Sequence, residues 1–379
     1  MSMSPQLRLA IAKRAGLASG LLGMLCVLAE LCFLFPDWLV TKDALPIYKA
    51  HLALLRGILQ ASIVATFALG AVSVLLLRFD RVTHSYRRGL LGLALGMTAL
   101  LMGGADVEPL DLTVAPSVSA GLDYFVLELL LLGLIFVPLE ALFPLHEQPV
   151  LRAGWQTDLK HFFVSHVGVQ LLSFAALLPA QWLLAWALRL EFQQTVAAQP
   201  LWLQVLELVF IVDFFTYWIH RAFHQVPWLW SFHAIHHSSL QMDWLAGSRI
   251  HVVDALLTRA VAFVPVFLLG FAAPALYVYL VFVSFHAVFI HANLRWRFPV
   301  LRWIISTPEY HHWHHSSDEE GIDKNFAQFL PLWDCLFGTA HQPSYWPTRY
   351  GTVNFQPPQS YLGQLTYPLR RHKDETPYG

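Results

Sequence analysis

The sequence predicts an all-α fold: a polytopic membrane helical bundle that carries a histidine-rich helical cap on its cytoplasmic face. Hydrophobic residues make up 56% of the 379-residue chain and charged residues only 13%, whereas soluble domains carry about 25% charged residues. Several apolar stretches are long enough to cross a hydrocarbon core of about 30 Å as helices. Three histidine clusters follow these stretches. The chain is therefore expected to be an integral membrane protein with its polar chemistry at one end.

Charge and cysteine content exclude several classes of protein. The net charge is -1 and the sequence pI is about 7.0, so the chain lacks the basic surface that nucleic-acid binding requires. The three cysteines, Cys26, Cys32 and Cys335, form no C-x-x-C pair. They therefore indicate neither a disulfide framework nor a thiolate metal site.

Six apolar stretches are predicted to cross the membrane before the first histidine cluster. They lie near 17–39, 52–77, 88–104, 121–144, 161–190 and 201–219. Basic residues precede the first stretch, but no small-residue cleavage site ends it. We therefore expect a membrane span there, not a removed signal peptide.

The charges in the connections orient these spans. The connections at 78–88 and 152–160 carry Arg and Lys, whereas those around 106–111 and 193–200 carry neither. By the positive-inside rule, the N-terminus and the two basic connections are cytoplasmic. Six crossings then return the chain to the cytoplasm just before His220.

The stretch 252–290 is too long for a single span and has Pro265, Gly270 and Pro274 near its middle. Proline and glycine interrupt helices, so we expect a hairpin that enters the membrane and returns. The chain then divides into an N-terminal membrane region of about four spans (1–145), a histidine-box domain (146–345) and a cytoplasmic C-terminal tail (346–379).

The histidine clusters carry the chemistry. Box 1 has the pattern H-x3-H, and boxes 2 and 3 have the pattern H-x2-H-H. The predicted metal ligands in these boxes are His220, His224, His233, His236, His237, His311, His314 and His315. Positions i, i+3 and i+4 share a helix face, so each box can direct two or three imidazoles to one point. A lone histidine is usually a surface or hydrogen-bonded residue, but eight in this pattern favour a dinuclear metal site, because imidazole is a common ligand of iron, zinc and copper.

The motifs resemble those of the fatty acid hydroxylase/sterol desaturase superfamily, over about 155–345. Further segments fall in the family's order: His237-Ser238-Ser239, Arg249 with His251, His291-Ala292-Asn293, Thr307-Pro308, Lys324-Asn325-Phe326 and 333–339, which reads WDCLFGT. The sequence departs from the family at Asp254, where His-Pro-x-Glu is common, and at Ala327 and Cys335. None of these departures changes a box histidine.

The resemblance implies a non-haem diiron monooxygenase that uses O2 to hydroxylate or desaturate a C–H bond of a lipid or sterol-like substrate. Two iron ions are the implied cofactor, although histidine cages also accept zinc. The implied partners are the bilayer, an apolar lipid and a separate electron donor of the ferredoxin or cytochrome b5 type with its reductase, since no His-Pro-Gly-Gly haem segment occurs.

Three other histidines are weaker candidates. His291 follows the predicted hairpin on the side of the clusters. His251 and His286 are either ligands themselves or hydrogen-bond donors that orient a ligand imidazole. Asp213 and Asp243 lie near the boxes and are candidate acceptors for a ligand's second N–H. A different class of protein also stays open: a membrane redox carrier or metal-handling protein without lipid chemistry. Haem ligands are usually isolated histidines on facing spans, and a haem absorption band would identify such a carrier.

Overall fold

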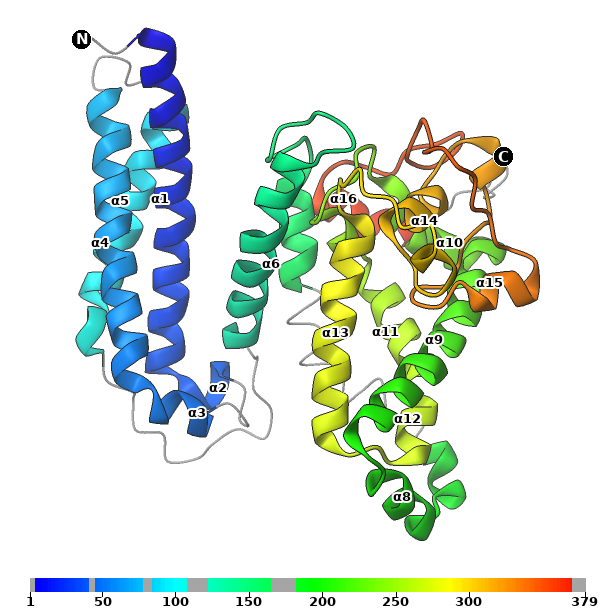
Figure 1. The fold of residues 1–379 in the computed structure, drawn as a ribbon. Helices are drawn as coiled ribbons and strands as arrows, with labels where there is room; N and C mark the ends of the chain where they lie inside the picture. The colour runs from blue at the N-terminus through cyan, green and yellow to red at the C-terminus, as the bar shows by residue number, and fades with distance from the viewer. Residues whose placement is uncertain (1–3, 41–44, 78–83, 108–121, 165–181, 370–379) are drawn as a thin grey trace. The chain divides into compact units, whose positions relative to one another are not determined.

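The computed structural model describes residues 4–40, 45–77, 84–107, 122–164 and 182–369. These residues form α-helices and short 3-10 helices, and they contain no β-strand beyond two isolated bridges (Figure 1). The all-α prediction is confirmed. The chain divides into two compact units, Met1–Leu129 and Leu130–Gly379.

Three long helices form most of the first unit. Its elements are α1 (Pro5–Leu34), α2 (Pro36–Leu39), α3 (Leu45–Ala50), α4 (Leu52–Leu76), α5 (His84–Leu101) and the 3-10 helix η2 (Gly104–Asp106). Small residues allow α1, α4 and α5 to approach closely. A Cβ added to Gly92 would lie 1.9 Å from Ser19 Oγ, and one added to Gly70 would lie 2.9 Å from Leu93. Such contacts are typical of packed membrane helices.

The second unit carries the histidine boxes. Its helices begin with the part of α6 (Leu122–Leu142) that follows Leu129, and continue with η3 (Ala185–Ala187), α8 (Leu190–Ala197), α9 (Leu201–Gln225), α10 (Pro227–His233), η4 (His236–Ser238), η5 (Ala246–Ser248), α11 (Val252–Ala262), α12 (Val264–Leu269), α13 (Ala273–His291), η6 (Leu301–Trp303), α14 (Pro308–His314), η7 (Glu319–Gly321), α15 (Leu332–Phe337), α16 (Tyr361–Thr366) and η8 (Tyr367–Leu369). Leu132 and Phe136 of α6 pack against Val288 and Leu294. The last predicted helix of the N-terminal region therefore packs with the histidine-box unit, and the domain boundary at 145 stays a prediction.

Seven described helices are long and apolar enough to cross a membrane. They are Gln6–Leu34, Leu52–Leu76, Tyr86–Asp106, Asp123–Leu142, Leu201–Gln225, Val252–Leu269 and Ala273–His291. Five correspond to predicted stretches, although the first begins about ten residues earlier than 17–39 and the fifth extends past 219 to Gln225. The predicted span at 161–190 lies mostly outside the described residues. The protein is an integral membrane protein.

The predicted hairpin in 252–290 is present as two antiparallel arms. Helices α11 and α12 form the first arm and α13 forms the second, and Gly270 ends the first arm with a left-handed φ of 73°. Pro265 and Pro274 each stand in the first turn of a helix, where proline is tolerated because those N–H groups have no intrahelical acceptor. The turn is also held from α8 and α9: Gln193 donates to Phe267 O, and Gln204 accepts from Ala272 N–H.

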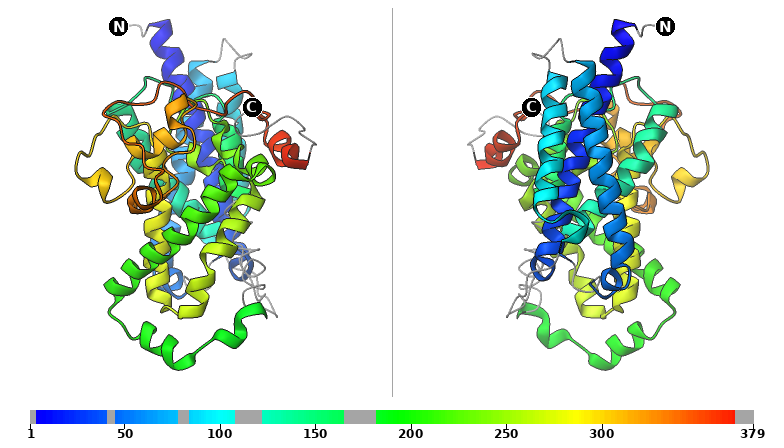
Figure 2. Two further views of the ribbon diagram at one scale, coloured as in Figure 1. Left: turned by 90° about the vertical axis from the view of Figure 1, so that its right-hand side faces the viewer. Right: turned by 90° about the vertical axis from the view of Figure 1, so that its left-hand side faces the viewer.

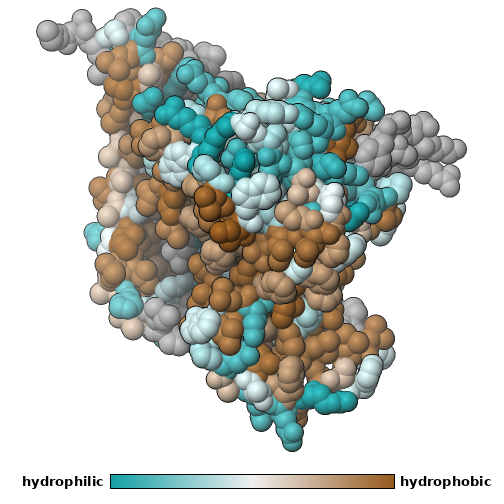
Figure 3. All heavy atoms as spheres, turned by 45° about the vertical axis from the view of Figure 1, so that its right-hand side comes forward, coloured by the Kyte–Doolittle hydropathy of each residue, from teal (hydrophilic) through white to brown (hydrophobic). Residues whose placement is uncertain are grey.

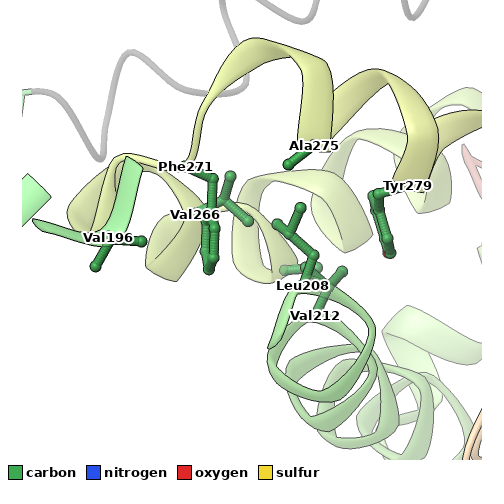
Figure 4. Close-up of a cluster of buried hydrophobic side chains, with 8 residues drawn as sticks. Val196, Leu208, Val212, Val266, Phe271, Ala275 and Tyr279 are labelled. Carbon is green, nitrogen blue, oxygen red and sulfur yellow. The ribbon is translucent and has the colours of Figure 1, made fainter. Parts of the chain in front are cut away.

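A buried apolar cluster joins the hairpin to α8 and α9. It contains Val196, Leu208, Val212, Ala262, Val266, Phe271, Ala275 and Tyr279 (Figure 4). On the face shown in Figure 3, apolar residues cover the long helices and polar residues gather over one end. Side chains such as Val278 and Val281 on α13 are exposed, as expected for contact with lipid. Figure 2 shows that the C-terminal ends of helices α9 and α13 lie at the same end of the unit as α14.

The C-terminal segment packs onto the histidine-box unit. Thr157 Oγ1 donates to Gln359 O, and the His161 ring contacts Gln364 Oε1 at 2.7 Å. His251 Nε2 lies 3.1 Å from Leu365 O. The part of 346–379 that the structure describes is therefore bound to the domain it follows.

Candidate metal centre

Box 1 lies on the last two turns of α9. His220 and His224 are four residues apart on this helix, so their rings lie on the same face, with centroids 5.3 Å apart. The helix ends at Gln225 because Pro227 begins α10, and the residue before a proline is disfavoured in the helical region. Box 1 is thereby fixed at the polar end of a spanning helix.

Box 2 is not one continuous helix. Helix α10 ends at His233, and His236 and His237 stand in the separate 3-10 helix η4. The rings of His236 and His237 lie at 89° to each other. His233 and His237 belong to one group of ligand atoms and His236 to another, so this box directs two of its three imidazoles to one point, as the spacing allows.

Box 3 lies on α14, which has Thr307 as its N-cap and Pro308 as its first residue, and His315 is the C-cap of this helix. His311 and His315 are four residues apart and face one way, whereas the His314 ring lies at 82° to that of His315. Helix α13 adds His291 as its last residue. Two spanning helices and three shorter elements thus meet at one end of the unit (Figure 1).

The histidines form two groups whose ligand atoms lie within 4.8 Å of one another. The five-histidine group contains His220, His224, His233, His237 and His314, and the four-histidine group contains His236, His291, His311 and His315. All eight predicted box histidines and His291 are included. Either group has enough imidazoles to hold one metal ion.

Most of these rings are fixed through Nδ1. His220 Nδ1 lies 2.7 Å from Phe326 O, His314 Nδ1 lies 2.9 Å from Lys324 O and His291 Nδ1 lies 2.6 Å from Ala287 O. A carbonyl oxygen only accepts hydrogen bonds, so Nδ1 carries the proton and Nε2 presents its lone pair to the group. Such a second contact fixes the tautomer and orientation of a ligand histidine.

The contacts between Nε2 atoms fit a bound cation. His220 Nε2 and His233 Nε2 are 3.0 Å apart, and His236 Nε2 and His291 Nε2 are 3.4 Å apart. In each pair both Nδ1 atoms face a carbonyl or carboxylate acceptor, so two lone pairs face each other without a proton. Two nitrogens on one tetrahedral ion are separated by about 3.3 Å, because metal–nitrogen bonds measure about 2.0–2.1 Å.

Three further nitrogens of the five-histidine group have no hydrogen-bond partner among the described residues. Nε2 of His224, His237 and His314 is buried without a hydrogen bond, and buried polar atoms are rarely left so. A cation at the five-histidine group satisfies all three atoms. The donor set therefore fits metal ions.

Burial sets the charge state of the cap histidines. Desolvation, followed by neighbouring imidazoles, lowers the pKa of His236, His237, His311 and His315 well below the usual value. Burial also lowers the pKa of His314 to about 3. These rings are neutral near pH 7, which is the form that binds metal.

His251 and His286 belong to neither group. His251 caps α11 through Val253 N–H and contacts Leu365 O, and His286 Nε2 lies 2.9 Å from Ser306 O. His312, adjacent to two group members, contacts Tyr350 Oη and Ala292 O through its two ring nitrogens.

The carboxylates beside the boxes differ from those expected. Asp213 accepts from Phe329 and Leu330 N–H, and Asp243 accepts from Arg152 and Ala246 N–H. The carboxylates that contact a box histidine are Asp254, 2.7 Å from His233 Nδ1, and Asp323, 3.3 Å from His224 Nδ1. The position of Asp254 in a family motif was the signal for the first. Asp323 lies in an acidic loop and gave no signal in the sequence.

A buried ion network supports box 2. Asp158 accepts from Arg152 Nη2 at 2.8 Å and from Arg249 Nε at 2.5 Å, and Arg152 also binds Asp243. Arg249 donates to Ser238 Oγ through its side chain, and its carbonyl oxygen faces His236 Nδ1. Arg249 therefore contacts the side chains at both ends of η4.

Comparison with known proteins agrees with this geometry. Residues 205–339 match the family model described as fatty acid hydroxylase. This part of the chain is a fatty acid hydroxylase domain. We found no significant match among solved structures.

Three curated relatives share this part of the chain. The ornithine lipid hydroxylase OlsE of Rhizobium tropici is 32% identical over 172 residues, which cover 45% of this chain and 52% of that protein. Human alkylglycerol monooxygenase is 36% identical over 129 residues, 34% of this chain and 28% of that protein. The very-long-chain aldehyde decarbonylase GL1-6 of Oryza sativa subsp. indica is 26% identical over 174 residues, 41% of this chain and 27% of that protein. The chain thus spans about half of the first relative and less of the others.

Proposed function

We propose that this protein is a non-haem diiron monooxygenase that uses O2 to hydroxylate a C–H bond of a membrane lipid. The observation that carries the proposal is the convergence of nine histidines, eight of them buried, in two groups at the end of apolar helices. The relatives' names describe a lipid hydroxylase and a monooxygenase, which supports the same class of reaction. We further propose that this end faces the cytoplasm, where a soluble electron donor can reach it.

Iron held by the two groups supplies the redox chemistry that activates O2. The reaction combines the substrate, O2, two electrons and two protons, and yields the alcohol and water. The electrons come from a separate donor of the ferredoxin or cytochrome b5 type. The histidines hold the ions as neutral ligands, and the Nδ1–H groups of His220, His291 and His314 donate to backbone carbonyls.

The surrounding chain keeps the site dry and close to lipid. Phe326 lies against His220, His224 and His314, with ring centroids 5.0–5.9 Å apart. A cavity of about 30 Å³ lies beside His224, His237 and His314; it has room for about two water-sized molecules. The substrate's alkyl chain is expected to remain among the apolar spans while its polar head stays at the interface.

The test is a reconstitution with isotope-labelled oxygen. Full-length protein in lipid nanodiscs receives ferrous iron, a ferredoxin with its reductase, and a polar lipid extract under heavy-isotope O2. We expect lipids that gain one labelled oxygen atom, detected by mass spectrometry, and no gain with His315→Ala. Products that lose two hydrogens without label would replace hydroxylation by desaturation. Absence of both products, with two ions bound, would reject the proposal.

A redox carrier remains the alternative, and its readout is independent. A carrier would show a haem absorption band in the purified protein. The described histidines that face each other do so in two compact groups at one end of the unit, which disfavours haem ligation by isolated histidines on facing spans.

A further inference from the structure

The two histidine groups differ in the acceptors that their Nδ1 atoms contact. In the five-histidine group, Asp254 contacts His233 and Asp323 contacts His224. In the four-histidine group, His236 and His291 face the carbonyl oxygens of Arg249 and Ala287. Among the described residues, no carboxylate forms an ion pair with a member of the four-histidine group. Two formal negative charges therefore stand behind one group only.

Both carboxylates are placed by their own surroundings. Asp254 is 5% exposed, stands in the first turn of α11 and accepts from Thr258 Oγ1 at 3.3 Å. Asp323 has a left-handed φ of 56° in the loop after α14, and its carboxylate lies 3.3 Å from His224 Nδ1. In the part of the chain that the structure describes, neither carboxylate forms an ion pair with lysine or arginine, although the charges of Lys324 and Arg221 act on Asp323. The basic partners in contact with the two carboxylates are these histidines.

A carboxylate that accepts the Nδ1 proton makes the opposite ring nitrogen a stronger donor to a cation. It also compensates positive charge in a region where the effective dielectric constant is low. A backbone carbonyl carries no net charge and has a weaker effect. We infer that Asp254 and Asp323 are positioning residues that make the five-histidine group the tighter of two unequal metal sites. This inference rests on the proposed dinuclear centre.

Stepwise removal of metal tests whether the two sites differ in affinity. The full-length protein in nanodiscs is loaded with Zn²⁺, or with Fe²⁺ without oxygen, and equilibrated with increasing chelator. The number of ions that remain is then counted by mass spectrometry. We expect two steps of one ion each. His315→Ala should lower the chelator concentration needed to remove only the loosely bound ion, and His224→Ala should lower that needed to remove only the tightly bound ion. A single step in the native protein, or the reverse assignment, would overturn the inference.

The carboxylates are tested by variants that keep their size. Loss of such a contact typically weakens metal binding about 10–100-fold, so Asp254→Asn and Asp323→Asn should each move the tight step by that factor and leave the loose step in place. Asp254→Glu keeps the charge and should restore much of the affinity. Asp323 is the safer site to change because its side chain is 28% exposed.

The matched control is Glu320→Gln, three residues from Asp323. Glu320 is exposed and accepts from Tyr345 Oη instead of contacting a box histidine, so this variant should leave both steps unchanged. If the asparagine variants behave like this control, or if they move the loose step, the inference fails. Metal counts do not require turnover, so failure of the inference is distinguishable from failure of the monooxygenase proposal.

Discussion

Most ligand candidates are oriented by a contact of Nδ1, which leaves Nε2 free to bind a cation. Five of the nine grouped histidines have Nδ1 within 3.2 Å of a carbonyl or carboxylate oxygen: His220, His233, His236, His291 and His314. The Nε2 atoms then converge without any rearrangement when a cation binds. A preorganised site of this kind loses little conformational entropy on metal binding.

Replacing His314 should remove metal without abolishing the fold. His314 Nε2 is buried and lacks a hydrogen-bond partner among the described residues, so His314→Ala removes a ligand, the hydrogen bond with Lys324 O and the ring contact with Phe326. We expect metal content to fall from two ions toward one, measured on purified protein after dialysis. The control is His312→Ala, because His312 contacts Tyr350 and Ala292 instead. Equal metal loss in both variants would contradict the assignment.

Arg152 should matter for stability more than for metal binding. Its guanidinium is 1% exposed and binds both Asp158 and Asp243. Arg152→Met leaves two buried carboxylates with one fewer cation, and breaking a buried ion pair in this way costs about 3–5 kcal/mol. Thermal unfolding in detergent should show a clear fall in Tm. Adding Asp243→Asn should recover part of it, and a double variant no more stable than the single one would argue against this network.

The residue types of the site could be predicted from the sequence, but their grouping could not. Spacing alone identified the box histidines, because H-x2-H-H is rare outside metal sites. Spacing could not show that neighbours such as His236 and His237 serve different groups, since that depends on where α10 ends. Acceptors such as Phe326 O and Lys324 O belong to the backbone and leave no trace in the sequence. Asp323 became visible only through the fold of its loop.

At the level of elements, the hairpin of α11, α12 and α13 brings His291 to the boxes. Its two arms measure 18 and 19 residues, which corresponds to about 27–29 Å at 1.5 Å per residue. The arms are therefore matched to each other and to the hydrocarbon thickness. His251 precedes the first arm and His291 ends the second, so both return to the histidine end.

Gly270 should be required for the hairpin turn. Its φ of 73° is unfavourable for residues with a side chain, and an added Cβ would lie 2.7 Å from Gln193 Cβ. We expect Gly270→Ala to destabilise the protein by about 1–2 kcal/mol from the backbone alone, and by more once Gln193 is displaced. The control is Gly57→Ala on α4, where nothing lies within 4 Å of the new Cβ. The stabilities of both variants are compared by thermal unfolding. A Gly270→Ala protein as stable as the control would contradict this account.

The break was predictable because Pro265, Gly270 and Pro274 interrupt a stretch that is too long for one span. The ends of the helices were less predictable from the sequence. The first span begins at Gln6 because Ser4 caps α1 by accepting from Leu7 N–H. Hydropathy alone placed that start later, since Arg8, Lys13 and Arg14 lie on the first turns. A capped helix tolerates such charges at a membrane surface.

At the scale of the whole molecule, the polar histidine groups lie at one end of long apolar helices. Leu145 N–H donates to Asn293 O, which places the chain just after α6 beside the end of α13. Leu201 begins α9, whose 25 residues extend about 37 Å toward box 1. The connection between 145 and 201 thus joins opposite ends of the unit. The span that the sequence predicts at 161–190 falls within this connection and lies mostly outside the described residues.

Orientation in the membrane gives the last prediction. By the positive-inside rule, the basic residues in 78–88 and 152–160 predict that the histidine end lies in the cytoplasm. Single cysteines at Glu319 and Ala198, both exposed, are introduced into a protein whose Cys26, Cys32 and Cys335 are replaced by serine. A membrane-impermeant maleimide should label Glu319→Cys only from the cytoplasmic side and Ala198→Cys only from the other side. The reverse pattern would invert the protein and leave the two groups intact, but a cytoplasmic electron donor could not then reach them. Labelling of both sites from one side would show that α9 does not cross the membrane.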